Sequence, residues 1–279
     1  MSTPLFGPAG NSESFYAAGK KSTKQAPAWL KDLGLDAYEY QCGNGVTGSD
    51  ANFLAVGEEA RKNGIALSLH APYYISLASA EEEKRDNSIR YILESARAAS
   101  WMGAERIVVH SGGIGKMTRE DAYALAETTL RRAIDAVRAE GLDTVICPEV
   151  MGKINQLGNL EEVLRFCSID ETLIPCVDFG HLNSRLHGGL IYKEALDEIF
   201  AALGEQRAKL LHIHFSKIEY SKGGEVRHLT FDDTQFGPDY VPLMEEIARR
   251  GMTPTVICES AGTQTDDALA MKNCWQQLV

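Results

Sequence analysis

The 279-residue sequence has no run of about 18 consecutive apolar residues, the length that a membrane-spanning helix needs. The segment from Met1 to Asn11 also lacks the basic start and apolar run of a secretory signal. Low-complexity segments, charge blocks and internal repeats are absent, so nothing indicates a linker or a second domain. We therefore expect one cytoplasmic domain over residues 1–279 that does not associate with membranes.

Cysteine motifs and positive charge are scarce as well. None of the six cysteines forms a CxxC pair, and Cys147 and Cys258 lie in apolar runs, so we expect reduced, buried thiols. Lys and Arg total 28 against 39 Asp and Glu, a formal net charge of −11. That balance argues against a protein that coats nucleic acid by bulk electrostatic attraction. Any contact with DNA must therefore be local.

Short β-branched runs alternate with longer amphipathic stretches along the whole chain, which is the pattern of repeated strand–helix units around a parallel sheet. The runs are PLFGPA, DAYEYQ, IALSLH, RIVVH, TVICPE, IPCVDF, KLLHIHF and TPTVICE. Helices are expected between them at 51–63, 80–102, 119–140, 160–167, 191–203, 240–250 and 265–278. Because barrels of this kind need about 250 residues, eight such runs predict a closed (β/α)8 TIM barrel of the α/β class.

Several expected helix ends carry residues that start or stop helices. Thr118 and Asn159 are followed by acidic residues and should cap helix N-termini. Gly103 and Gly251 fall where helices should end in a left-handed turn. After the seventh run, residues 216–238 carry no such pattern, and we predict a long irregular loop with a functional role.

Polar side chains end six successive strands of the predicted barrel. Loops at the carboxyl ends of barrel strands build active sites, so these residues should meet at one rim. Imidazoles and carboxylates gathered there would leave buried charges unpaired unless cations lie among them. Mixed His and carboxylate ligation suits Zn²⁺, Mn²⁺ or Fe, and the number of groups predicts two or more ions. The rim residues are His70, His110, Glu149, Asp178, His212, His214 and Glu259.

The segments HAPYYISLA, VVHSGG, ICPEVMG, CVDFGHLN, LHIHFSK and ICES resemble, in order and approximate spacing, the signatures of the endonuclease IV family. The resemblance implies an enzyme with two or three zinc ions that cleaves double-stranded DNA 5′ to abasic sites in base excision repair. Glu149 would bridge two ions, and Glu149 and Glu259 are the candidate catalytic carboxylates. The implied metal ligands are His70, His110, Glu149, Asp178, His181, His212, His228 and Glu259.

The sequence departs from the family pattern at the third ion. The family has an Asp two residues before the loop histidine His228, but this chain has Val226 there. Either Glu225 or His214 would supply the missing ligand, or the enzyme would have two metals and a weak third site. His214 is a candidate because it should face the barrel interior like His212, two residues before it.

The predicted DNA-binding residues also differ from the family. The second strand's loop, EYQCGNGVTGSD, has no basic side chain of its own, which leaves penetration of the duplex there in doubt. Tyr73 matches a family aromatic residue that packs against the DNA. The basic group in the long loop, a candidate for phosphate contacts, consists of Lys217, Lys222 and Arg227. No obligate protein partner is indicated.

The competing interpretation is a sugar isomerase or epimerase of the xylose isomerase-like barrels. Glu149, Asp178, His212 and Glu259 would also form a single-metal sugar site, and the fold alone cannot decide between the two. The acidic composition and the changed second loop favour such a small substrate. His70, His110 and His181 favour the nuclease, because a one-metal epimerase does not require them. A barrel that only binds a metal or a protein is the non-enzymatic alternative.

Overall fold

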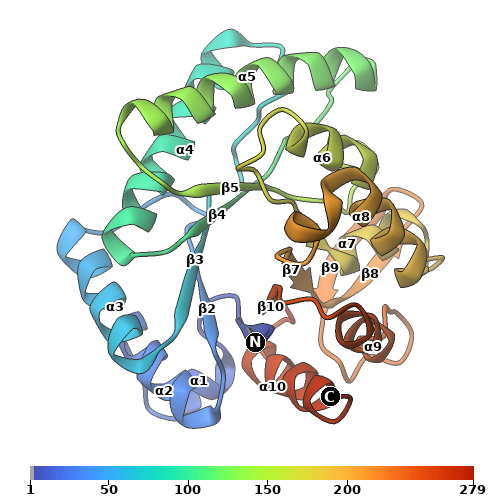
Figure 1. Ribbon diagram of the computed structural model, residues 1–279. Helices are drawn as coiled ribbons and strands as arrows, with labels where there is room; N and C mark the ends of the chain where they lie inside the picture. The colour runs from blue at the N-terminus through green and yellow to red at the C-terminus, as the bar shows by residue number, and fades with distance from the viewer. Residues whose placement is uncertain (1–2) are drawn as a thin grey trace.

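The computed structural model describes residues 3–279, which form a ring of parallel strands surrounded by helices (Figure 1). The strands of the ring are β1 (Leu5–Pro8), β2 (Ala37–Gln41), β3 (Ala66–His70), β4 (Arg106–Val109), β5 (Val145–Pro148), β6 (Cys176–Asp178), β7 (His212–Phe215) and β10 (Thr255–Cys258). They pair as two arcs, in the orders β1-β10-β7-β6 and β2-β3-β4-β5. Parallel bridges from Ala9 to Glu39 and from Glu149 to Cys176 join the arcs at both seams. The ring is therefore closed, and the prediction of a (β/α)8 barrel is confirmed.

One glycine is required where the first seam closes. A Cβ atom on Gly7 of β1 would lie 1.8 Å from the carbonyl oxygen of Ala37 in β2. No other residue type fits at that distance, so glycine allows the two backbones to approach closely. The residue type at position 7 is thus set by closure of the barrel.

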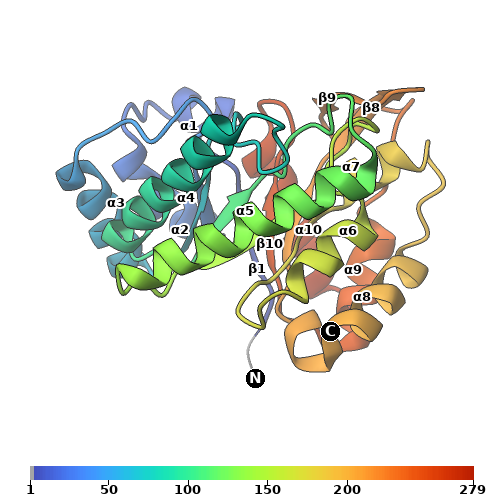
Figure 2. The same ribbon diagram turned by 90° about the horizontal axis from the view of Figure 1, so that it is seen from above.

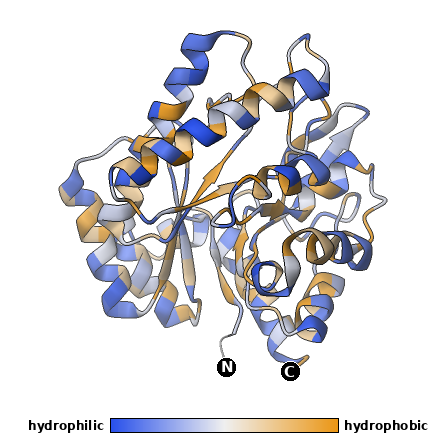
Figure 3. Cartoon of the chain, turned by 45° about the horizontal axis from the view of Figure 1, so that its top comes forward, coloured by the Kyte–Doolittle hydropathy of each residue, from blue (hydrophilic) through white to orange (hydrophobic). Residues whose placement is uncertain are grey.

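The outer layer contains the predicted helices, with ends that differ by a few residues from expectation. They are α3 (Asp50–Asn63), α4 (Glu82–Met102), α5 (Arg119–Ala139), α6 (Leu160–Cys167), α8 (Tyr192–Ala208), α9 (Val241–Arg250) and α10 (Gln264–Gln276). Helix α6 begins with a capping box in which Asn159 and Glu162 each accept the other's backbone N–H, at 2.8 and 2.9 Å. Gly103 and Gly251 end their helices with φ of 70° and 57°, as predicted. In Figure 3 the hydrophobic colour follows the central strands, while the helices alternate in character.

Four helical elements, each of eight residues or fewer, were not predicted from the sequence. They are α1 (Glu13–Ala17), η1 (Thr23–Gln25), α2 (Ala26–Leu33) and α7 (Phe179–Arg185). The last of these matters for the site. Asp178, the end of β6, caps α7 by accepting a hydrogen bond from the backbone N–H of His181 at 2.7 Å.

Among residues 3–279, no helix combines the length and apolar character that crossing a membrane demands.

The segment 216–238 is not the irregular loop that the sequence predicted. β8 (Lys217–Ser221) and β9 (Gly224–Leu229) form an antiparallel hairpin. Figure 2 shows this hairpin at the end of the barrel opposite the two termini. Most of its side chains are half-buried or exposed, so no apolar run marked the two strands. A bridge between Lys153 and Gly224 connects the hairpin to the loop that follows β5.

Candidate metal centre

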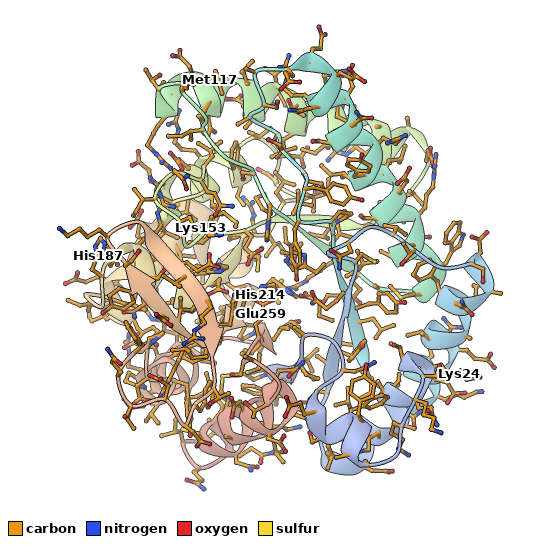
Figure 4. The ribbon with its side chains drawn as sticks, turned by 180° about the vertical axis from the view of Figure 1, so that it is seen from behind. Lys24, Met117, Lys153, His187, His214 and Glu259 are labelled. Carbon is orange, nitrogen blue, oxygen red and sulfur yellow. The ribbon has the colours of Figure 1, made fainter. Side chains whose placement is uncertain are left out.

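The carboxyl ends of the barrel strands open into a cavity of about 650 Å³. Asp178 and His214 are fully buried and contact residues of its wall. Figure 4 shows His214 and Glu259 together near the centre of the ring. The predicted site residues that line the cavity itself are Tyr73, His70, His110, Glu149, His181, Glu225, His228 and Glu259. The structure thus brings the strand-end residues to one rim.

Glu149 lies at the centre of this group and is fully buried. Its Oε2 is 2.9 Å from Nε2 of His110 and 3.3 Å from Nε2 of His70. Its Oε1 is 3.2 Å from Nδ1 of His214 and 3.5 Å from Nδ1 of His181. Each carboxylate oxygen therefore faces two imidazoles. This is the placement that a carboxylate between two metal ions would need, and the bridging role stays a prediction.

Three histidines are oriented through one ring nitrogen, which leaves the other free for a ligand. Nδ1 of His70 lies 2.8 Å from the carbonyl oxygen of the next residue. Nδ1 of His181 lies 3.0 Å from the carbonyl oxygen of Val150, and Nδ1 of His228 lies 2.8 Å from Oγ of Ser216. Hydrogen bonds of this kind fix the ring and the tautomer of metal-binding histidines. In each case Nε2 remains available for a metal.

The hairpin supplies a further group, formed by His181, Glu225 and His228. Nε2 of His181 is 3.4 Å from Oε2 of Glu225, and the rings of His181 and His228 are 5.3 Å apart. Val226, which stands where the family has an Asp, is about half exposed. Of the two substitutes considered from the sequence, Glu225 therefore lies in the third group. His214 lies with Glu149 instead.

The structure places His212 and His214 differently from the expected ligand set. Sequence similarity placed His212 with Asp178 and Glu259, but the compact group there contains His214 together with Glu149. Strand β7 pairs with β6 so that Asp178 is opposite His214, whereas His212 is opposite Cys176, deeper in the barrel. Both histidines are fully buried, and the register between the strands decides which one lies level with Asp178.

Glu39 of β2 is a buried residue that the sequence reading missed. Its Oε2 accepts a hydrogen bond from Ser68 Oγ at 2.9 Å and lies 2.9 Å from Nε2 of His212. Its Oε1 lies 3.0 Å from Nε2 of His214. The sequence feature that could have identified Glu39 is its position as a charged residue between two tyrosines in the run DAYEYQ. A carboxylate buried inside a barrel must be paired, and here histidines of the site pair it.

The buried donors and acceptors fit divalent metal ions. Oε2 of Glu149 and Oδ2 of Asp178 are buried without a hydrogen-bond partner among the described residues, although histidine nitrogens lie within 3.3 Å of each. When Nδ1 of His70 donates to the carbonyl oxygen of Ala71, its Nε2 carries a lone pair, which faces Oε2 of Glu149 as two ligands of one cation would. His and carboxylate donors together suit Zn²⁺ and related metals. One further compact group, Cys176 with His212 and His214, lies deeper in the barrel.

The electrostatics of the site also favour cations. Burial raises the pKa of Glu259, but His214 and His228 lower it more, to about 2. Burial lowers the pKa of His181, yet Asp178, Glu149 and Glu225 raise it overall, to about 10. The Glu259 carboxylate therefore stays ionised near neutral pH and attracts positive charge, whereas burial raises the pKa of Asp178. Protons on the imidazoles or metal ions can supply that charge.

The predicted DNA-binding residues have separate environments. Tyr73 is about half exposed at the cavity, and its ring stacks on His110 with centroids 5.4 Å apart. Lys217 Nζ donates to the carbonyl oxygens of Phe231, at 2.7 Å, and Asp233, so this ammonium holds the loop after β9 rather than facing a phosphate. Arg227 is exposed and donates to Glu219 at 2.7 Å.

Lys153, in the loop after β5, was not identified from the sequence. Among the described residues that line the cavity, it is the only lysine or arginine. Its loop is held by Arg185, which donates to the carbonyl oxygens of Met151, at 3.1 Å, and Lys153, at 2.7 Å. Arg119 donates to the carbonyl oxygen of Gln156 in the same loop at 3.1 Å. A fixed loop thus places one lysine in the wall of an otherwise acidic and imidazole-rich cavity.

Comparison with known proteins gives a family and two kinds of relative. A model of the xylose isomerase-like TIM barrel family matches residues 27–274. An uncharacterised protein of Methanocaldococcus jannaschii is 34% identical over 253 residues, covering 89% of this chain and 90% of that protein. A probable endonuclease 4 of Malacoplasma penetrans is 26% identical over 238 residues, covering 78% of this chain and 81% of that one.

Solved structures with the same fold include enzymes of both classes considered above. Endonuclease IV from Thermus thermophilus superposes with a TM-score of 0.68 at 19% identity, covering 99% of this chain and 98% of that one. A D-tagatose 3-epimerase-like protein gives a TM-score of 0.71 at 18% identity, covering 98% and 96%. At these identities the likeness shows the fold alone, so the choice between the classes depends on the residues of the site.

Proposed function

The chain belongs to the xylose isomerase-like TIM barrel family, and we propose that it is a metal-dependent endonuclease that cleaves double-stranded DNA 5′ to abasic sites. The observation that supports this most is the overlap of ligand groups on one rim, two of which share both Glu149 and His214. A phosphodiester carries a negative charge and has a poor leaving group, and clustered cations address both difficulties. The substrate class is that of the endonuclease 4 relatives.

Two or three ions, Zn²⁺ or else Mn²⁺ or Fe, would be held by the residues described above. When bound, such ions neutralise phosphate charge and lower the pKa of water. His70 and His110 would share one ion with Glu149, and Glu149 would also share the second ion. The remaining ligands of the second ion would be Asp178, His214 and Glu259, and those of the third would be His181, Glu225 and His228.

Side chains around the ligands would orient the substrate. Tyr73 is about half exposed at the mouth of the cavity, where its side chain can contact a sugar or base. Lys153 would contact a phosphate next to the cleaved bond. The Glu259 carboxylate faces the cavity and remains unprotonated near neutral pH. It can therefore accept a hydrogen bond from the attacking water as well as bind metal.

Incision of a duplex that carries one abasic analogue tests this function directly. The protein should contain two or three metals per chain and nick the strand 5′ to the lesion, and chelation should abolish nicking. An undamaged duplex of the same sequence is the control. Glu149→Gln should abolish incision far more than it weakens DNA binding, because the carboxylate between the metals is lost. Near-normal turnover by that variant would refute the bridging role of Glu149.

A second candidate is a single-metal sugar isomerase or epimerase, and the cavity wall favours it in one respect. Besides the metal ligands, the wall carries uncharged polar groups suited to sugar hydroxyls, from Gln41, Gln156, Ser260 and Gln264. One metal per chain, no incision, and exchange of a ketose carbon-bound hydrogen with solvent deuterium would establish this candidate instead. Two or three metals with incision would exclude it as the main activity.

A further inference from the structure

Glu39 lies in β2, inside the barrel and beneath the rim, and donors surround its carboxylate. Ser68 and His212 approach Oε2, each at 2.9 Å. Gln41 Nε2 donates to Oε1 at 3.2 Å, and Nε2 of His214 lies 3.0 Å from the same oxygen. Ser68, Gln41 and His212 thus form hydrogen bonds with one buried carboxylate, and Nε2 of His214 lies beside it without hydrogen-bond geometry. Both oxygens of the Glu39 carboxylate must accept hydrogen bonds in this arrangement, which requires the ionised form.

His214 is turned opposite to the other oriented histidines of the site. Those rings contact the protein through Nδ1 and leave Nε2 free. Nε2 of His214 lies 3.0 Å from Glu39, whereas its Nδ1 is within hydrogen-bond distance of Glu149 Oε1, at 3.2 Å, and 3.5 Å from Glu259 Oε1. Nδ1 is therefore the nitrogen that faces the ligand group at the rim.

We propose that Glu39 is a positioning residue of the metal centre, which fixes the proton of His214 on Nε2 and keeps its Nδ1 lone pair directed at the metal. A carboxylate on the far nitrogen of a metal-binding imidazole fixes the ring and raises its basicity. Glu39 would thus orient the ring of His214 through Nε2, as backbone carbonyl oxygens orient the rings of His70 and His181 through Nδ1. This inference rests on the metal centre of the proposed function but not on its DNA substrate.

The same carboxylate gives His212 a supporting role. Its Nε2 contacts Glu39, and its Nδ1 is buried without a hydrogen-bond partner among the described residues. An alternative to this supporting role is that His212 itself binds a metal ion, in the deeper group that it forms with Cys176 and His214. If His214 used Nε2 to bind that ion, this nitrogen could carry no proton toward Glu39. The two arrangements therefore differ in the protonated nitrogen of His214 and in whether a thiolate binds.

Metal titration of a Glu39→Gln variant of the full chain tests the proposal. The amide has the shape of the carboxylate, but it replaces one acceptor by a donor, so one imidazole must change its tautomer. We expect Zn²⁺ binding at the rim to weaken about 10- to 100-fold in competition with a chelator, while the metal-free variant stays folded. Glu162→Gln, which changes a buried carboxylate of α6 paired with Arg119, should bind Zn²⁺ like the wild type.

Two measurements on the wild type do not depend on the folding of a variant. ¹⁵N NMR of the zinc-loaded protein should show His214 protonated on Nε2, and the Co²⁺-loaded protein should show no thiolate charge-transfer band. Unchanged Zn²⁺ affinity in Glu39→Gln, a proton on Nδ1, or a thiolate band would each overturn the proposal. A protein that binds metal as expected but leaves abasic DNA intact would refute only the nuclease function. A wild type without metal at this rim would refute both.

Discussion

Substitution of His214 and His212 by glutamine, one at a time, separates the two assignments of the metal ligand on β7. Sequence similarity favours His212, whereas the structure places His214 with Glu149, Asp178 and Glu259. Glutamine is the informative replacement because its amide can still donate a hydrogen bond to Glu39 but does not replace an imidazole as a metal ligand. The two variants therefore differ mainly in whether a ligand is lost.

The expected effects differ by an order of magnitude or more. Four ligands bind structural Zn²⁺ with roughly 10–16 kcal/mol, so one ligand contributes about 2.5–4 kcal/mol if the share is equal. His214→Gln should then weaken Zn²⁺ binding on the order of 100- to 1,000-fold. His212→Gln removes no metal ligand and keeps a donor for Glu39, which lies 2.9 Å from His212, so it should weaken binding about 10-fold or less.

Zn²⁺ affinity is measured by chelator competition on metal-free protein, with thermal melting to verify that each variant is folded. A melting temperature near that of the wild type makes the comparison valid, because both histidines are fully buried. The reasoning from register is wrong if His212→Gln loses as much affinity as His214→Gln. It is also wrong if only His212→Gln loses affinity, which would restore the assignment made from sequence similarity.

Two other predictions concern the hairpin and the cavity lysine. Glu225→Ala should lower the metal content by one ion per chain, because it removes the carboxylate beside His181, and Val226→Ala should leave the content unchanged. An unchanged content in Glu225→Ala would mean that no third ion depends on this group. Lys153→Met should weaken binding of an abasic duplex and reduce the slope of log K against log salt by about one. Lys31→Met, on the exposed side of α2 and outside the cavity wall, is its control; an equal loss in both variants would contradict a specific role of Lys153.

The sequence predicted the barrel and its rim because both follow from local patterns. Each strand is a short apolar run, and the polar residue that ends it stands out, as His70 does after IALSL and Glu149 after TVICP. In a closed parallel barrel these ends must meet on one side, so convergence of the residues needed no further information. The helix caps at Asn159 and Gly103 were predictable for the same local reason.

What the sequence could not supply depends on contacts between distant segments. The choice between His212 and His214 is set by the register of β6 against β7, which alternation along one strand does not encode. Glu225 joins the site only because the hairpin folds over the loop after β5. Glu39 comes from a strand whose end carries no metal ligand, so no rim pattern led to it. Each of these residues lies at the site because of how distant segments of the chain pair, and its residue type alone does not indicate that position.

The number of bound metals and the charge of the substrate are linked through these carboxylates. Five of them surround the centre: Glu39, Glu149, Asp178, Glu225 and Glu259. With neutral histidines, one divalent cation leaves the group at a net charge of about −3, which repels a phosphodiester and suits an uncharged sugar. Three divalent cations bring it to about +1, which attracts a phosphate even though the chain as a whole is acidic. The acidic composition is therefore no argument against DNA once the third group is filled, and metal content alone should separate the two enzyme classes.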